Sequence, residues 1–208
     1  MTSEEIFKDA QDLTAREVSS RRVDVLRAVA NLIAEHGIDG MSMRQVADAA
    51  GLSTGTINYY FRNKQTLIAA AMDYVYSLPA DRDALRNKPA LEQIRNAISI
   101  FSFTTEGHRR WWRFWLEYAA RAARDQDLMD SHDERYTRQR RYFRALIDAG
   151  REDRELRPDI DVDETVDTLL ALIDGLATHQ IINSRSVNPA RAAHLLERFL
   201  ESLTAPPA

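Results

Sequence analysis

Cysteine is absent from this chain of 208 residues, and glycine and proline are scarce, with seven and six copies. Without cysteine the protein can form no disulfide, no thiolate zinc site and no cysteine nucleophile. Few glycines and prolines mean few tight turns, which favours long helices over a sheet of many strands. Because the sequence also lacks an alternating strand pattern and an internal repeat, it predicts an all-α fold.

Long apolar runs are also missing. No stretch approaches the roughly 18 consecutive apolar residues that a membrane-spanning helix requires. The segment from Met1 to Arg16 carries four acidic residues and no apolar run, so it does not resemble a signal peptide. We therefore expect a cytoplasmic protein with no membrane partner. Hydrophobic residues at 44% and charged residues at 29% suffice for a core and a solvated surface.

An excess of positive charge is missing as well. The net charge is −4, which argues against a protein that coats nucleic acid generally. The charge is unevenly distributed, because the segment from Arg16 to Thr66 contains seven basic and five acidic residues. A mildly basic head on an acidic body is suited to local contact with phosphates.

The N-terminal region has the signals of several short helices. Apolar residues recur every three or four positions from Ser20 to His36, and this period predicts a helix. Gly37 is placed to end that helix in a left-handed cap. Ser42 and Gln45 then fit a capping box, in which each side chain bonds a backbone N–H at the start of a second helix.

Two further helices follow at once. Gly51 ends the second helix, and Ser53 caps a third that runs to about Phe61. Asn63 caps a fourth helix, which Pro79 ends. The region therefore contains three helices and the start of a longer one.

The spacing of Ala47, Gly51 and Ile57 is that of a helix-turn-helix. Two helices that cross at a wide angle need a small side chain where they approach, and Ala47 provides it. The turn needs a residue that tolerates positive φ, here Gly51, and the branched side chain of Ile57 locks the crossing. An ordinary helical hairpin would contain the same residues only by chance.

Three polar segments favour DNA binding over a plain hairpin. Thr54–Thr56 offers two short hydroxyls and a bare glycine, which let the backbone approach bases and phosphates in a major groove. Asn58–Tyr60 places polar side-chain tips beside Ile57. Asn63 and Lys64 put free N–H groups and a cation at the start of the next helix, which suits a phosphate.

The stretch from Gly37 to Leu67, GIDGMSMRQVADAAGLSTGTINYYFRNKQTL, resembles the DNA-binding region of the tetracycline-repressor (TetR) family. The shared features are a glycine after the first helix, a capped second helix, a recognition helix ending in Tyr-Phe and a lysine opening the fourth helix. Ser53–Arg62 and Leu172–Ala177 are also similar to the subfamily of the choline-responsive betaine regulator BetI.

The resemblance implies about nine helices in three parts. These are a flexible arm over residues 1–17, a three-helix helix-turn-helix DNA-binding domain over 18–62, and an effector-binding and dimerisation domain over 63–204. It further implies a homodimeric, sequence-specific transcription regulator, a repressor that a small-molecule effector releases from a pseudopalindromic operator of double-stranded DNA.

The resemblance also implies the DNA contacts. Carried over residue by residue, they fall on Ser42, Arg44, Ser53, Thr54, Gly55, Thr56, Asn58, Tyr59, Tyr60 and Lys64. Many family members have tyrosine at the position of Asn58 and histidine at that of Tyr60. Two roles therefore stay open for Asn58, which either reads adenine through both of its side-chain groups or touches only a phosphate.

Beyond Pro79 the helical pattern lengthens, and it predicts helices over residues 90–103, 111–123, 128–153, 163–182 and 189–203. Seven aromatic residues lie between Phe101 and Tyr118, although the whole chain is only 8% aromatic. Aromatic residues at helical spacing usually form core, but four of these in five positions cannot all point one way. We expect some of them to border an effector pocket. The expected pocket residues are Phe101, Trp111, Trp115, Tyr118 and Tyr142.

Glu117 and Asp174 are the acids expected beside that pocket. A carboxylate next to tryptophan holds a cationic ligand through charge and cation–π attraction, so the effector is hydrophobic or cationic, choline-like being one candidate. Glu117 could equally be an exposed helix residue. Asp174 lies between Ile173 and Leu176 in an apolar helix, and it could instead satisfy a polar group at a dimer seam.

The last two helices are apolar enough to bury one face internally and to offer another to a second copy. Gly175 would allow the helices of two copies to approach closely. The residues expected at this dimer interface are Val166, Leu169, Leu170, Ile173, Gly175, Ala177, Ile181, Leu196, Phe199 and Leu203.

Two other classes of protein are alternatives to a regulator. The sequence has no phosphate loop, no GxSxG elbow and no HExxH, and none of its five histidines follows a glutamate by three residues as in a di-iron bundle. We therefore expect no enzyme, no catalytic residue, no metal and no cofactor. The second alternative is a helical protein–protein adaptor, or a ligand-binding bundle without DNA binding. It explains the amphipathic helices but not the polar segments from Ser53 to Lys64.

Overall fold

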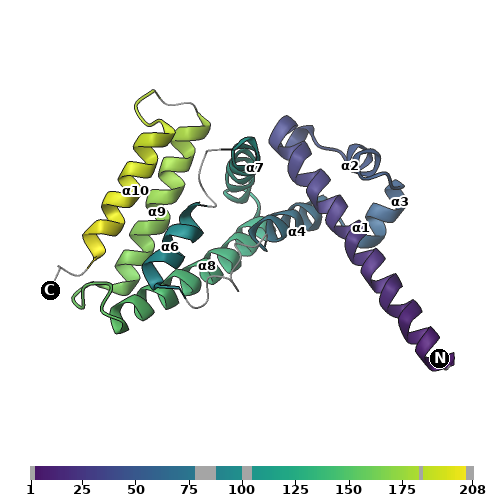
Figure 1. Ribbon diagram of the computed structural model, residues 1–208. Coiled ribbons are helices and arrows are strands. Elements are labelled where there is room, and N and C mark those ends of the chain that lie inside the picture. Colours follow the sequence, from purple (N-terminus) through teal and green to yellow (C-terminus); the bar gives the residue numbers. More distant parts are fainter. Residues whose placement is uncertain (1–2, 78–87, 100–104, 183–184, 205–208) are drawn as a thin grey trace.

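The computed structural model describes residues 3–77, 88–99, 105–182 and 185–204, which form nine α-helices (Figure 1). The helices are α1 (Ser3–Gly40), α2 (Met43–Ala50), α3 (Thr54–Tyr60), α4 (Lys64–Ser77), α6 (Ala90–Ser99), α7 (Glu106–Ala122), α8 (Gln126–Glu152), α9 (Val162–Ile181) and α10 (Pro189–Leu203). Within these ranges the only β-type pairing is one isolated bridge between Leu156 and Thr204. The predicted all-α fold is confirmed.

The helices are arranged along one direction. Helices α2 and α3 lie beside α1 at one end of the molecule, and α9 and α10 lie side by side at the other, with α4 and α7 between them (Figure 1). This order separates the helix-turn-helix from the C-terminal helices.

Helix α1 is longer than predicted. It begins at Ser3 rather than Ser20, so residues 3–17, expected as a flexible arm, are helical and project from the rest of the chain (Figure 1). The reason is composition, because the sequence has no glycine or proline before Gly37 to stop a helix. Gly37 has the predicted positive φ of 72°, but its ψ of 169° is extended, so it kinks α1 rather than forming a left-handed helical cap.

The helix-turn-helix has the predicted caps. The Ser42 N–H donates to Gln45 Oε1 at 2.8 Å, and the Gln45 N–H donates to Ser42 Oγ at 3.3 Å, which completes the capping box. Gly51 adopts the left-handed conformation with φ 66° and ψ 32°. Ser53 Oγ accepts from the Thr56 N–H at 3.1 Å, which caps α3.

Two apolar clusters hold the chain together. The first joins buried residues of α1, α2, α3 and α4 with three residues of α7, namely Phe114, Tyr118 and Ala122. The second joins α6, α9, α10 and the C-terminal half of α8 with Trp112 of α7. Half-buried Trp115 packs against both clusters. Because α4 shares its core with the helix-turn-helix, the boundary expected between residues 62 and 63 crosses the first cluster.

In the C-terminal part, the helix bounds depart from expectation mainly at α7, which begins at Glu106 instead of residue 111. The cause is an N-cap that the aromatic pattern hides, since Thr105 Oγ1 accepts from the His108 N–H at 3.2 Å. Of the described helices, none has the length and apolar character needed to cross a membrane.

Candidate functional site

The turn between α2 and α3 presents α3 as a short helix on the surface. Ala47 and Ile57 are 1% and 0% exposed, so both occupy the crossing that their spacing predicted. The Leu52 N–H donates to the Ala47 carbonyl at 2.9 Å, which fixes the chain directly after Gly51. One face of α3 is therefore held in the first cluster, and the opposite face is free.

That free face carries most of the predicted DNA contacts. Tyr59 is 85% exposed, whereas tyrosine side chains are commonly at least partly buried. Its neighbour Tyr60 is half-buried against the first cluster. The other exposed residues of this segment are Ser53, Thr54, Gly55 and Asn58, while Thr56 is half-buried.

The contacts predicted outside α3 lie in different surroundings. Ser42 and Arg44 are exposed at the start of α2, and the Arg44 guanidinium lies 4.0 Å from Asp48 in a solvated pair. Lys64, predicted to contact a phosphate, donates from Nζ to the Met41 carbonyl at 2.6 Å. This bond ties α4 to the loop before α2 and uses one of the three N–H groups of the lysine.

Sequence reasoning missed one contact at the end of α3. The guanidinium of Arg22 lies 5.5 Å from the ring centroid of Phe61, which is buried. This cation–π contact joins α1 to the residue that ends α3. Helical periodicity alone did not indicate it, because the two residues are far apart in the sequence.

The aromatic residues of α7 divide between core and partly exposed positions. Trp112 is 1% exposed and makes edge-on contacts with Trp111 and Trp115, at centroid distances of 4.4 and 5.2 Å. Trp111, Trp115 and Tyr142 are half-buried against the second cluster, as residues that border a site would be. Phe101, also expected there, lies outside the described residues.

Two of the expected pocket residues lie elsewhere. Glu117 is exposed and faces α1, where a Cβ added to Gly37 would lie 3.3 Å from Glu117 Oε2. Tyr118 is fully buried in the first cluster, and its hydroxyl donates to the Leu128 carbonyl at 2.7 Å. Both residues lie on the face of α7 that packs towards the helix-turn-helix, so the structure does not group them with Trp111 and Tyr142.

Asp174 has a shifted acidity. Burial raises the pKa of its carboxyl from 3.8 to about 7. Burial, followed by the charges of Asp167 and Asp174, raises the pKa of Tyr136, which packs against the second cluster. Tyr136 was not among the expected site residues, because its place on α8 relative to α9 is a matter of tertiary packing.

Most residues expected at the dimer interface are buried within one chain. They pack in the second cluster, so little of their surface is left for contact with a partner. These residues are Val166, Leu169, Leu170, Ile173, Ala177 and Leu203. Ile181, Leu196 and Phe199 are half-buried, and Gly175 is exposed with no atom within 4 Å of an added Cβ.

A capped helix-turn-helix with an exposed polar recognition face, joined to a helical body, defines a DNA-binding regulator. Residues 25–71 match the family model described as bacterial regulatory proteins of the tetR family. Residues 90–205 match the model of the BetI-type transcriptional repressor C-terminal region. The chain belongs to the TetR family, whose members are ligand-responsive transcription regulators and not enzymes.

Named relatives agree with this assignment. The regulator PksA of Bacillus subtilis is 31% identical over 187 residues, which cover 88% of this chain and 89% of that protein. The regulator BetI of Escherichia coli K12 is 29% identical over 193 residues, covering 88% and 93%. A solved structure of a regulator from Saccharomonospora viridis in complex with choline has a TM-score of 0.79 and 25% identity, covering 90% of this chain and all of that one.

Proposed function

We propose that α3 enters the major groove of an operator and that Tyr59 is its principal contact with the DNA backbone. The observation that carries this proposal is the 85% exposure of Tyr59 on a helix whose opposite face, at Ile57, is fully buried. A helix anchored in this way presents a rigid polar ridge, and a phenolic hydroxyl at its edge reaches a phosphate oxygen.

The other proposed DNA contacts are assigned from the position of each residue on or near α3. The start of α3 supplies small groups that approach base edges, at Thr54, Gly55 and Thr56. Asn58 is exposed beside them and reads adenine or touches a phosphate. Supporting backbone contacts come from Ser42, Arg44, Ser53, Tyr60 and Lys64. The protein acts as a repressor on DNA in the cytoplasm.

The proposed effector is a small organic cation. Asp174 is half-buried, burial raises the pKa of its carboxyl to about 7, and a bound cation would replace the solvation that burial removes. Half-buried aromatic rings of Trp111, Trp115 and Tyr142 pack on the same cluster as Ile173, the neighbour of Asp174. The related structure that contains choline supports a quaternary ammonium as the first compound to test.

The proposed dimer pairs the outer face of α9 with that of a second copy. Ala171, Gly175 and His179 are exposed at spacings of four along α9, and Ile182 directly after it is 61% exposed. The small residues Ala171 and Gly175 let two helices approach closely, and Leu196 and Phe199 of the neighbouring α10 are half-buried. A two-fold pair would then read a pseudopalindromic operator.

The test of DNA recognition begins with selection of binding sites from random duplex DNA. With the selected operator, Tyr59→Ala is expected to weaken binding at least tenfold, because the exposed ring and hydroxyl are both removed. The melting temperature and circular dichroism should not change, since the side chain has few contacts within the chain. Tyr59→Phe is the matched control, which separates loss of the hydroxyl from loss of the ring.

Equal operator affinity of Tyr59→Ala and the unmodified protein would reject α3 as the reading helix. Selection that enriches no sequence would favour the adaptor, which has no reason to prefer any duplex.

A further inference from the structure

Arg135 of α8 is the only charged residue that is buried among the described residues, with 4% of its surface exposed. Its guanidinium donates to the Tyr118 hydroxyl, to Asp73 Oδ1 at 3.2 Å and to Ser131 Oγ at 2.8 Å. It also lies 4.6 Å from the centroid of the Tyr118 ring. One planar side chain therefore joins α4, α7 and α8, which a lysine could not do with the same geometry.

On one side this junction holds the DNA-binding unit. Asp73 belongs to α4, whose Leu67 and Met72 are buried in the first cluster together with Ile57 of α3. The bond from Lys64 to the Met41 carbonyl fixes the start of α4 to the loop before α2. Because these parts share one packed core, a displacement of α4 displaces α3 with it.

On the other side the same turn of α8 carries Tyr136, which packs against the second cluster. The rings of His132 and Tyr136 stack at 6.0 Å with 22° between their planes, and His132 lies 6.3 Å from the Tyr118 ring. The rings of Tyr118, His132 and Tyr136 therefore form a series that runs from Arg135 to the second cluster, which also contains Ile173, the neighbour of Asp174.

We propose that Arg135 is a positioning residue that transmits movement of α8 at the effector site to α4, and through α4 to the recognition helix. The inference rests on the proposed function, because it takes Asp174 as part of the effector site. A buried guanidinium that lost Asp73 would be left without a counter-charge, which is strongly unfavourable. Helix α4 therefore follows α8 when α8 moves.

The test is a double-mutant cycle on operator affinity, which requires no effector. The variants are Asp73→Asn, Asp174→Asn and the two combined, measured at pH 8, where most of Asp174 is ionised. If Arg135 connects the two acids, the combined change in operator Kd should differ from the product of the single changes by threefold or more. Effects that multiply to within about twofold would overturn the inference.

The chain offers a matched control. Arg138 donates to the same Asp73 oxygen at 2.9 Å, but its side chain is 55% exposed, so water solvates its charge. Arg138→Gln combined with Asp174→Asn should therefore show multiplying effects. If the combined change in operator Kd differs from the product of the single changes equally in this second cycle, the cause is a general effect of charge. That result would also overturn the role of Arg135.

Two further measurements keep the outcomes distinct. Arg135→Lys retains the positive charge but loses the planar guanidinium. Combined with Asp174→Asn, it should change the operator Kd by a factor that differs from the product of the single changes, as Asp73→Asn does. Thermal unfolding checks that each variant is folded. Choline is then added to the unmodified protein bound to operator. If choline leaves operator affinity unchanged, the proposed effector class is wrong, whereas the cycles still decide the role of Arg135.

Discussion

Asp174 is a carboxyl whose burial and proposed ligand have opposite effects on its charge. Burial raises its pKa to about 7, so the neutral form is the majority in the empty protein below that pH. A bound cation favours the ionised form instead, because it supplies the electrostatic stabilisation that water no longer provides. Binding of a cation at Asp174 is therefore linked to the loss of a proton.

This linkage gives a prediction for choline binding. With a pKa near 7, about a tenth of Asp174 is ionised at pH 6 and about nine tenths at pH 8. The affinity for choline, measured by calorimetry, should therefore rise about tenfold from pH 6 to pH 8. Asp174→Asn should bind weakly and without this pH dependence. The neutral isostere 3,3-dimethyl-1-butanol is the matched ligand, and tight binding of it would show that charge does not matter.

At the scale of elements, the two glycines that flank Ser53 have opposite roles. Gly51 has a φ of 66° and ends α2, whereas Gly55 has ordinary helical geometry at the start of α3, where an added Cβ would meet only Ser53 Oγ at 3.7 Å. Side chains disfavour the first conformation and accept the second. The turn therefore requires a glycine at Gly51. At Gly55 the fold does not require one, so we assign the need for a small residue there to the DNA.

The same substitution should consequently give two different results. Gly51→Ala is expected to lower the free energy of unfolding by about 1 kcal/mol, and folded protein should keep operator affinity within about threefold. Gly55→Ala should retain full stability but lose operator affinity about tenfold, because the methyl group occupies space needed by the DNA. Urea unfolding and operator titration measure the two effects. A loss of stability without a loss of affinity in Gly55→Ala would contradict the assigned role.

Local signals predicted the helices best where they are strong. The capping box of Ser42 and Gln45, the turn at Gly51 and the start of α10 at Pro189 were all predicted at the residue where they occur. The start of α7 was not predicted at the right residue, because the aromatic run from Trp111 is a stronger helical signal than the single hydroxyl of the N-cap Thr105. Helix ends depend on one or two hydrogen bonds, and periodicity does not record them.

The candidate site was predictable only in part. The exposed face of α3 follows from local pattern, because the residue that anchors it, Ile57, lies on the same short helix. Arg135 was not predictable, since α8 contains several arginines at helical spacing and only packing shows which one is buried. For the same reason the sequence did not show which of the expected dimer residues are buried within their own chain, because an apolar pattern does not say whether a face meets its own chain or another.

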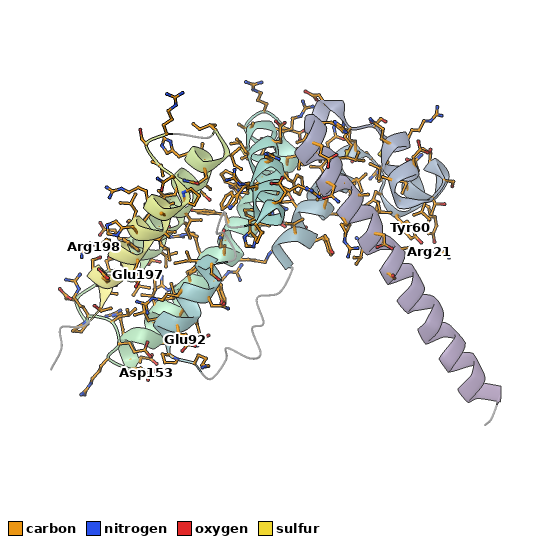
Figure 2. The ribbon with its side chains drawn as sticks, turned by 45° about the horizontal axis from the view of Figure 1, so that its top comes forward. Arg21, Tyr60, Glu92, Asp153, Glu197 and Arg198 are labelled. Carbon is orange, nitrogen blue, oxygen red and sulfur yellow. The ribbon has the colours of Figure 1, made fainter. Side chains whose placement is uncertain are left out.

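At the scale of the whole molecule, the recognition helix and the C-terminal helices lie at opposite ends (Figure 1). Figure 2 likewise places Tyr60 far from Glu197 and Arg198 of α10. A recognition helix of seven residues contacts few base pairs, so specific affinity calls for a second copy. Pairing through α9 would fix two recognition helices on one face of the duplex, about 34 Å apart or a multiple of this distance.

The exposed glycine of α9 provides the test of this arrangement. Gly175 is exposed, an added Cβ meets no atom within 4 Å, and arginine replaces a poor helix former, so the fold of one subunit should be as stable or more stable in Gly175→Arg. At the proposed seam, however, two arginines related by the two-fold axis would face each other and repel. Sedimentation velocity should show dimers of the unmodified protein and mainly monomers of the variant at the same micromolar concentration.

Operator affinity should fall with dimerisation, by tenfold or more, because each monomer then binds one half-site alone and loses the advantage of simultaneous contact. Ala120→Arg is the matched control, since it places the same side chain at an exposed position of α7. If Gly175→Arg remains as dimeric as this control, α9 does not form the seam. The two recognition helices would then have to be related through another surface, and the half-site spacing of the selected operator would have to fit that surface instead.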